Sequence, residues 1–432
     1  MSDAALPYAP PFRPQLAALG IAGSMLVTVG VFLSGFVISE PAPYELFMAG
    51  LIGLWAIVGL RISRSIAPLL VLILLFNIGG MLSLTVLDDL SEGPIYIAVS
   101  LFLALSSVFF AAIVEARPVR LELIFRAWVA SALITAVLGI LGYFHAFPSA
   151  EIFTLYDRAK GAFQDPNVFG PFLVAPSLYL IYGLLSGRIV GAPFKVIGLL
   201  ILALGVFLSF SRAAWALYLF CAVALVFVML LKERTGAFRL KILILSLSAA
   251  GLMIVALVTA LQFDKVANLF SSRTQLVQEY DGGRLGRFER HRLGFLMSME
   301  KPLGIGPMQF SKIFPEDEHN IYLKSLTTYG WLGFLCYLTL MSWTLWAGFK
   351  LLLRDRPWQP FLMISYITIV GHASIGFVID TDHWRHFYLL LGIVWGCIAL
   401  ERRHGHSPPR PRERAPLLRG TPLKNCRDFS AT

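Results

Sequence analysis

Long apolar segments recur along most of this chain of 432 residues, and they limit its possible folds more than any other feature. A helix of about 20 residues crosses the hydrocarbon core of a membrane, which is about 30 Å thick. About twelve segments approach or reach that length. They cover 16–38, 44–60, 66–87, 94–114, 121–146, 168–186, 194–210, 212–231, 241–261, 319–349, 360–380 and 386–400. Because only helices satisfy their own backbone hydrogen bonds in lipid at such lengths, we predict an all-α, polytopic integral membrane protein with about 12 transmembrane helices.

The charges between these segments predict how the chain is oriented. Lysine and arginine concentrate in short cytoplasmic loops, whereas long loops cross the membrane largely regardless of charge. Basic side chains occupy every second short loop, at 61–64, 117–126, 188–195, 232–241 and 350–356. Three of the alternate loops are short and acidic, at 40–45, 88–92 and 380–382. We therefore predict a multi-pass protein of the bacterial inner membrane with both termini in the cytoplasm and a periplasmic loop at 262–318.

A transmembrane domain over 1–400 and a basic tail over 401–432 account for the whole chain. The tail carries much of the net charge of +10 and is too polar to pack, so we expect it to be disordered and to rest on anionic membrane lipids. Charge alone does not indicate a nucleic-acid partner. Three of the four cysteines lie in apolar segments, and their spacing fits neither a disulfide framework nor a metal site. We predict no cofactor and no bound metal.

The polar segment 262–318 contains the side chains best suited to chemistry. Residues 284–300 have the pattern of an amphipathic helix that ends before Pro302. Arg284, Arg287 and His291 share one face of this helix. Four apolar side chains are expected to pack on the neighbouring surface: Leu285, Phe288, Leu296 and Met299.

Six short motifs follow one another along the chain and meet at the predicted outer face. They are Pro166-Asn167-Val-Phe-Gly170, Ser209-Phe-Ser-Arg212-Ala-Ala-Trp215, Gly286-Arg287, Pro302-Leu-Gly-Ile-Gly306, His319-Asn320-Ile-Tyr322-Leu and Tyr329-Gly-Trp-Leu-Gly333. In order and spacing they resemble the core domain of the O-antigen ligase and polysaccharide polymerase family, over roughly 160–345. The chain departs from the family pattern at His291, where family members often carry tryptophan.

The resemblance implies an enzyme of surface polysaccharide assembly with the fold of lipid-carrier-dependent membrane glycosyltransferases. Such an enzyme transfers an oligosaccharide from undecaprenyl pyrophosphate to a hydroxyl acceptor at the periplasmic membrane face. The acceptor is lipid A-core for a ligase and a growing glycan for a polymerase. The displacement is inverting and independent of metal.

The chemistry of that reaction assigns roles to the motif residues. A departing pyrophosphate needs cationic, preferably forked donors, which Arg212 and Arg287 supply. The attacking hydroxyl needs a proton acceptor, and a neutral imidazole such as that of His319 suits this role near pH 7. Asn320 and Tyr322 are expected to orient that imidazole or to hold sugar hydroxyls.

Four further residues are candidates for substrate binding: Arg284, Arg290, His291 and Asn167. Each candidate has a structural alternative. The arginines of the loop helix are equally suited to a solvated surface, and Asn167 to capping a helix after Pro166. Arg212 is also compatible with a helix end or a snorkelling position, and His319 with an ordinary turn beside acidic residues.

A second class of function is a non-catalytic flippase or transporter of lipid-linked glycans. It would also require many membrane spans and cationic residues. Transporters place charge near the bilayer midplane within discontinuous helices, whereas the charges here concentrate at one predicted surface. The sequence therefore favours the enzyme.

Overall fold

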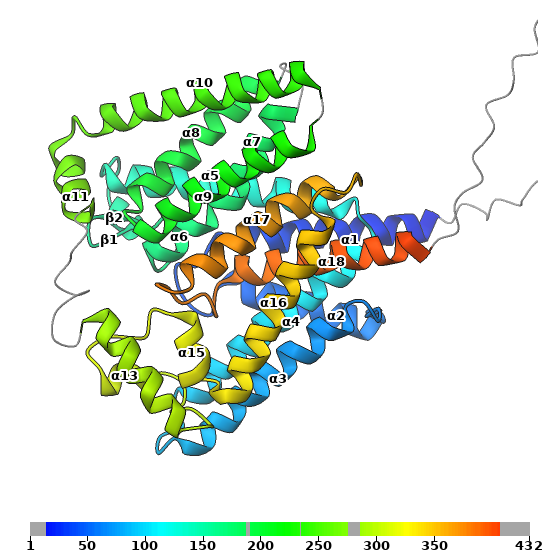
Figure 1. The fold of residues 1–432 in the computed structure, drawn as a ribbon, viewed down its shortest axis with the longest axis vertical. Coiled ribbons are helices and arrows are strands. Elements are labelled where there is room, and N and C mark those ends of the chain that lie inside the picture. The colour runs from blue at the N-terminus through cyan, green and yellow to red at the C-terminus, as the bar shows by residue number, and fades with distance from the viewer. Residues whose placement is uncertain (1–13, 187–190, 234, 275–285, 407–432) are drawn as a thin grey trace, which may run out of the picture.

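The structure, a computed structural model, describes residues 14–186, 191–233, 235–274 and 286–406 (Figure 1). The α-helices are α1 (Pro14–Leu33), α2 (Pro43–Val58), α3 (Ala67–Ser83), α4 (Gly93–Ala116), α5 (Arg120–Tyr143), α6 (Pro166–Phe172), α7 (Val174–Ser186), α8 (Ala192–Leu208), α9 (Arg212–Lys232), α10 (Gly236–Ala260), α11 (Asp264–Thr274), α13 (Arg287–Glu300), α14 (Phe310–Ile313), α15 (Ile321–Thr327), α16 (Gly330–Leu351), α17 (Gln359–Ile375) and α18 (Arg385–His406). Two 3₁₀ turns, η1 (Leu84–Val86) and η2 (Ala150–Phe153), and one antiparallel hairpin of β1 (Thr154–Leu155) with β2 (Arg158–Ala159) complete the described elements.

The predicted apolar segments are helical, although 168–186 and 319–349 are each divided between two helices. The expected all-α, multi-pass membrane architecture is therefore confirmed, and the number of about twelve transmembrane helices stays a prediction. Within the described residues, 6 helical segments are long and apolar enough to cross a membrane. They are Ala67–Val86, Gly93–Ala116, Arg120–Tyr143, Pro166–Ser186, Arg212–Lys232 and Gly330–Leu351. Several helices begin with proline in the first turn, where its missing N–H would have no intrahelical partner anyway.

The segment predicted as one helix over 319–349 is instead two helices, α15 and α16. The chain breaks before Gly330, whose φ of 66° lies in the left-handed region. A Cβ at this position would lie 2.7 Å from the Pro302 carbonyl oxygen, which accepts a hydrogen bond from the Trp331 N–H at 2.9 Å. The loop Pro302–Gly306, called the Pro302 loop below, thus contacts the break between the two helices. The pattern of apolar residues does not predict that contact.

Small residues allow the central helices to approach one another closely. α18 packs along α4, and a Cβ at Gly392 would lie 2.5 Å from the Ser107 carbonyl oxygen. Close backbone approach through small residues is a common source of helix association in membranes. α18 also extends to His406, into the range predicted as tail, and Glu401 pairs there with Arg354 and Arg356.

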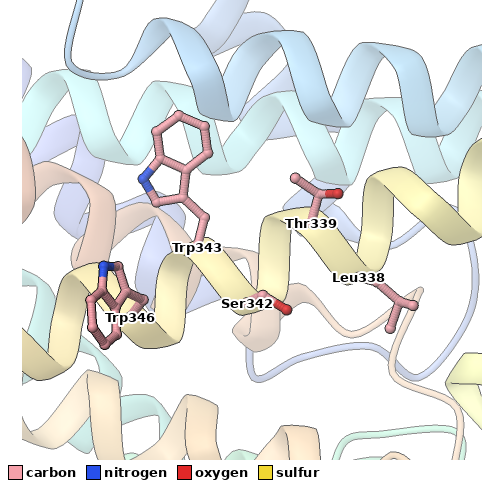
Figure 2. A pocket seen from close by; sticks show the side chains of 5 residues that line it. All are labelled: Leu338, Thr339, Ser342, Trp343 and Trp346. Carbon is pink, nitrogen blue, oxygen red and sulfur yellow. The ribbon is translucent and has the colours of Figure 1, made fainter.

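The outer face of α16 carries a shallow groove with a volume of about 580 Å³. Figure 2 shows the five residues that line it: Leu338, Thr339, Ser342, Trp343 and Trp346. The Trp346 side chain is 62% exposed. A groove lined by aromatic and small polar side chains suits contact with lipid, and it offers no titratable group for a reaction.

Both described ends of the chain lie on one side of the helices in Figure 1, at the start of α1 and the end of α18. The β-hairpin, α11, α13 and α15 lie at the other side. The described parts of the segment 262–318 are therefore remote from both ends of the described chain.

Candidate functional site

The loop helix α13 buries a different face from the one that its apolar residues suggest. Phe288, Leu296 and Met299 are 64%, 50% and 38% exposed, and the buried side chains include Arg290. The expectation that those three pack on a neighbouring surface does not hold within the protein. Arg284 and Leu285, from the same sequence pattern, lie outside the described residues.

Two contacts explain why the polar face of α13 is buried. The Phe310 ring packs closely on Gly294, and a Cβ at position 294 would lie 2.7 Å from a ring carbon. The Ser298 carbonyl oxygen accepts a hydrogen bond from the Trp331 indole N–H at 2.9 Å. α13 is therefore held against α14 and the start of α16 by one close approach and one hydrogen bond.

Arg290 and His291 of α13 hold the acidic segment that precedes His319. The Arg290 guanidinium, whose side chain is 4% exposed, pairs with the Glu316 carboxylate at 2.7 Å. His291 Nε2 lies 2.6 Å from the Glu318 carbonyl oxygen. Because a carbonyl oxygen only accepts, Nε2 carries the proton. Burial, together with the nearby Arg287 and Arg290, lowers the pKa of His291 and favours this neutral imidazole.

His319 has an unusual backbone conformation, with φ of 46°. A left-handed residue other than glycine is uncommon and persists when its surroundings restrain it. The restraint comes from both neighbours of His319. The Thr327 hydroxyl donates to the Glu318 carboxylate at 2.6 Å, and the Asn320 N–H donates to Asp380 Oδ1 at 2.8 Å. The imidazole is thus presented, half-buried, from a fixed loop.

Asn320 and Tyr322 also have structural partners. Asn320 Oδ1 caps α15 by accepting hydrogen bonds from the backbone N–H groups of Tyr322 at 3.0 Å and Leu323 at 3.1 Å. The Tyr322 hydroxyl donates to the Ala373 carbonyl oxygen of α17 at 2.7 Å. Both residues therefore lie beside His319, and both help to attach its loop to the helices.

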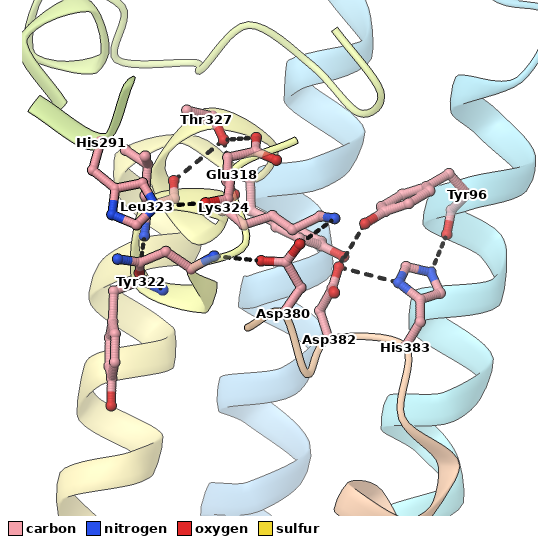
Figure 3. A network of polar contacts seen from close by, with 12 residues as sticks. Tyr96, His291, Glu318, Tyr322, Leu323, Lys324, Thr327, Asp380, Asp382 and His383 are labelled. Atoms are coloured by element: carbon pink, nitrogen blue, oxygen red, sulfur yellow. Dashed lines mark hydrogen bonds and ion pairs between the residues drawn. The ribbon is translucent and has the colours of Figure 1, made fainter. Parts of the chain in front are cut away.

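A charged network next to this loop was not identified as part of the site from the sequence (Figure 3). Lys324 pairs with Asp380 at 3.3 Å. Burial lowers the pKa of Lys324, but the carboxylates of Asp380 and Asp382 outweigh it and raise the pKa well above its ordinary value. The Tyr96 hydroxyl donates to Asp382 at 2.6 Å, and His383 Nδ1 lies 3.1 Å from the same oxygen. The sequence signal was the acidic loop 380–382, which was used only to predict orientation.

Glu318 has the most informative titration in the site. Its side chain is buried, and desolvation raises its pKa from 4.5 to about 7, against a lowering effect of Lys324 and in the same direction as Asp380. A carboxyl pKa that is higher in the folded state than in the unfolded state stabilises the folded protein at low pH. This stabilisation is fully present below about pH 4.5 and is lost as the pH rises through about 7.

We therefore expect the wild-type protein to unfold more easily at pH 8 than at pH 5, by at most about 3 kcal/mol. Glu318→Gln keeps an acceptor for Thr327 and should lose this component of the pH dependence. Thermal unfolding of both proteins in detergent between pH 4.5 and 8 tests this. Identical pH profiles for the two proteins would contradict the role of Glu318.

The Pro302 loop also supports α15. The Ile305 N–H donates to the Thr327 carbonyl oxygen at 2.7 Å, and Gly304, with φ of 80°, passes so close that a Cβ would lie 2.4 Å from that oxygen. Beside the loop is a hollow of about 640 Å³, whose polar lining includes Asp88 and Lys312. The predicted end of the loop helix before Pro302 is confirmed, because α13 ends at Glu300, and the close approach to Thr327 gives Gly304 a steric reason.

Arg212 and Asn167 form a second group, on α9 and α6. Arg212 is the first residue of α9 and directly follows the cap residue Ser211. Asn167 Oδ1 accepts a hydrogen bond from the buried Arg158 at 2.8 Å. α6 packs on α9, and a Cβ at Gly170 would lie 2.6 Å from the Ala214 Cβ. The two upstream motifs are thus neighbours in space, and Arg158 was absent from the sequence-based set.

Metal ligation has no obvious site in the part of the chain that the structure describes. That part contains no group of three or more His, Cys, Asp or Glu side chains placed to hold an ion.

Comparison with known proteins supports the motif-based resemblance over its central part. Residues 197–338 match a family model described as O-antigen ligase. No curated protein matches the chain. The matched segment includes Arg212, Arg287 and His319, whereas Asn167 and Asp380 lie outside it. Residues 197–338 of this multi-pass membrane protein therefore match the O-antigen ligase family, as their motifs predicted.

Proposed function

We propose that this protein transfers an oligosaccharide from undecaprenyl pyrophosphate to a hydroxyl acceptor at the periplasmic face of a bacterial inner membrane, in surface polysaccharide assembly. The observation that carries the proposal is the restrained loop that presents His319 within the segment that matches the O-antigen ligase family. Arg287 and the hydrogen-bonded His291 belong to the helix that holds this loop.

The proposed step is a direct displacement. The acceptor oxygen attacks the anomeric carbon of the donor sugar, and the bond from that carbon to the phosphate oxygen breaks. The His319 imidazole takes the hydroxyl proton, and undecaprenyl pyrophosphate leaves with the bonding electron pair. Attack from the face opposite the leaving group inverts the configuration of the anomeric carbon.

Arg212 and Arg287 are proposed to stabilise the charge that develops on the pyrophosphate. Arg212 stands at the N-terminus of α9, a helix of 21 residues, where the helix dipole is positive. A cation at this end is disfavoured by the dipole on its own, and a bound anion relieves that repulsion. The substrate-binding roles of Asn320, Tyr322, Arg284, Arg290, His291 and Asn167 remain part of this proposal.

Polymerase and ligase use the same donor and differ in the acceptor, so the proposal covers both. A strain that lacks the protein distinguishes them. Fully assembled, lipid-linked polymer in that strain would indicate a ligase, and single repeat units would indicate a polymerase. An unchanged pattern of surface and lipid-linked glycan on gels would count against both.

The proposed orientation has a direct test. With α11 and α13 in the periplasm and both termini in the cytoplasm, alkaline phosphatase fused after Thr274 should be active, and the same enzyme fused after Arg403 should be inactive. Activities of the two fusions, normalised to their amounts in the membrane, provide the measurement. The reverse pattern would place the site on the cytoplasmic side and contradict the proposal.

Metal independence is a further part of the proposal. Since the step needs only a base and cationic side chains, treatment with a divalent-metal chelator should leave the initial rate of transfer in detergent unchanged. A reproducible loss of rate that magnesium restores would instead point to the acidic residues Glu316, Asp317 and Glu318 as metal ligands.

A further inference from the structure

Arg158 is a buried arginine outside the segment that matches the O-antigen ligase family. It lies on β2, and the residue is 7% exposed. Its Nε donates to the Ser209 carbonyl oxygen at 2.8 Å, and its Nη2 donates to Asn167 Oδ1 at 2.8 Å. Because the guanidinium is a rigid fork, these two bonds fix the direction of both partners. One side chain thus joins the start of α6 to the end of α8.

The turn that Arg158 holds contains an uncommon backbone conformation. Ser209 ends α8 and Ser211 caps α9, and Phe210 between them has φ of 45°. A bulky residue keeps such a conformation only where its surroundings restrain it. The bond from Arg158 to Ser209 is one restraint. The indole N–H of Trp215, which lies 3.1 Å from the carbonyl oxygens of Val206 and Phe207, is another.

Arg212 follows Phe210 by two residues, so any relaxation of this turn moves the start of α9. We propose that Arg158 is a positioning residue, which fixes the turn from which Arg212 meets the donor pyrophosphate. This inference rests on the proposed function and deepens it. Arg158 itself is buried and already donates to Ser209 and Asn167, so it acts through the turn.

The test measures pyrophosphate binding and glycan transfer separately, with full-length protein in lipid nanodiscs. Inorganic pyrophosphate is the probe, and its binding is measured by titration calorimetry. Arg158→Gln should weaken binding roughly tenfold, because it removes the charged hydrogen bonds that fix the turn before Arg212. It should raise the KM for the lipid-linked donor similarly and leave the KM for the acceptor unchanged. Arg158→Lys retains one donor and should be intermediate.

Two further variants make the result specific. Arg126→Gln removes an exposed arginine of α5 that pairs with Glu122, and it should change neither measurement. Adding Arg158→Gln to Arg212→Gln should weaken pyrophosphate binding no further, because both changes act on one contact. If Arg158→Gln folds poorly, Arg158→Lys alone supplies the comparison, and it should shift pyrophosphate binding in the same direction by a smaller factor.

The outcomes separate this inference from the function on which it rests. Wild-type protein that binds pyrophosphate but transfers no glycan would defeat the proposed function. If the wild-type protein is active, and Arg158→Gln changes neither the pyrophosphate affinity nor the KM for the donor, only the inference about Arg158 is contradicted. If Arg158→Gln lowers the melting temperature but leaves pyrophosphate binding unchanged, Arg158 stabilises the fold and does not position Arg212.

Discussion

His319→Ala should abolish glycan transfer while the protein remains folded in the membrane. The substitution removes the proposed proton acceptor from a half-buried loop position, and loss of a general base typically costs about 10²–10⁴ in rate. It leaves the hydrogen bonds of Glu318 and Asn320 in place, because those bonds hold the neighbouring residues. Surface glycan and the amount of membrane protein, measured in the same cells, give the result.

The chain offers a matched control for this experiment. His145 is also a histidine with positive φ, 50°, and it is exposed in a turn after α5, outside the matched domain. His145→Ala therefore repeats the chemical change and the backbone context without touching the proposed site, and transfer should stay at the wild-type rate. Normal glycan from weakly expressed His319→Ala would refute the assignment of the base.

Replacing Arg212 and Arg287 by lysine should severely reduce transfer, each substitution alone and both together. Lysine keeps the positive charge but lacks the planar fork that binds two phosphate oxygens at once. If both arginines act on the same leaving group, the double variant should be little worse than the worse single variant. Initial rates with a lipid-linked donor, normalised to the amount of protein, supply the comparison.

Arg292→Lys is the control on the same helix as Arg287. Its side chain is 60% exposed and pairs with Glu289 of the adjacent turn at 2.8 Å, so transfer should not change. Near-normal transfer by both Arg212→Lys and Arg287→Lys would show that the fork is unnecessary. Small, additive losses would assign the two arginines to separate structural roles.

The helices were predictable because every segment that crosses a membrane needs apolar side chains and a backbone whose hydrogen bonds are satisfied within the helix. The break between α15 and α16 was not predictable, because it depends on contacts with the distant Pro302 loop. The buried face of α13 was also misjudged. Its Arg290 is buried by an ion pair with Glu316, which lies 26 residues further along the chain.

The central candidates of the site could be found from the sequence because polar residues at the ends of apolar segments stand out. The residues that form hydrogen bonds around these candidates could not be found in this way. Asp380 meets Asn320 across 60 residues, and Arg158 meets Ser209 across 51. Each pair is joined by folding of distant segments, and neither has a periodic or motif signal. The sequence therefore supplied the candidates for the base and the cations, and the structure shows which residues hold the His319 loop and the turn before Arg212.

Reconstitution of the purified protein tests the central claim most directly. The protein in liposomes or nanodiscs would be given an undecaprenyl-pyrophosphate-linked oligosaccharide and a hydroxyl acceptor, and the glycan linkage and the released lipid would be analysed. The account predicts a new glycosidic bond of inverted configuration and one undecaprenyl pyrophosphate for each bond formed, both lost with His319→Ala. Movement of intact donor across the liposome membrane without any new bond would contradict it and indicate a transporter.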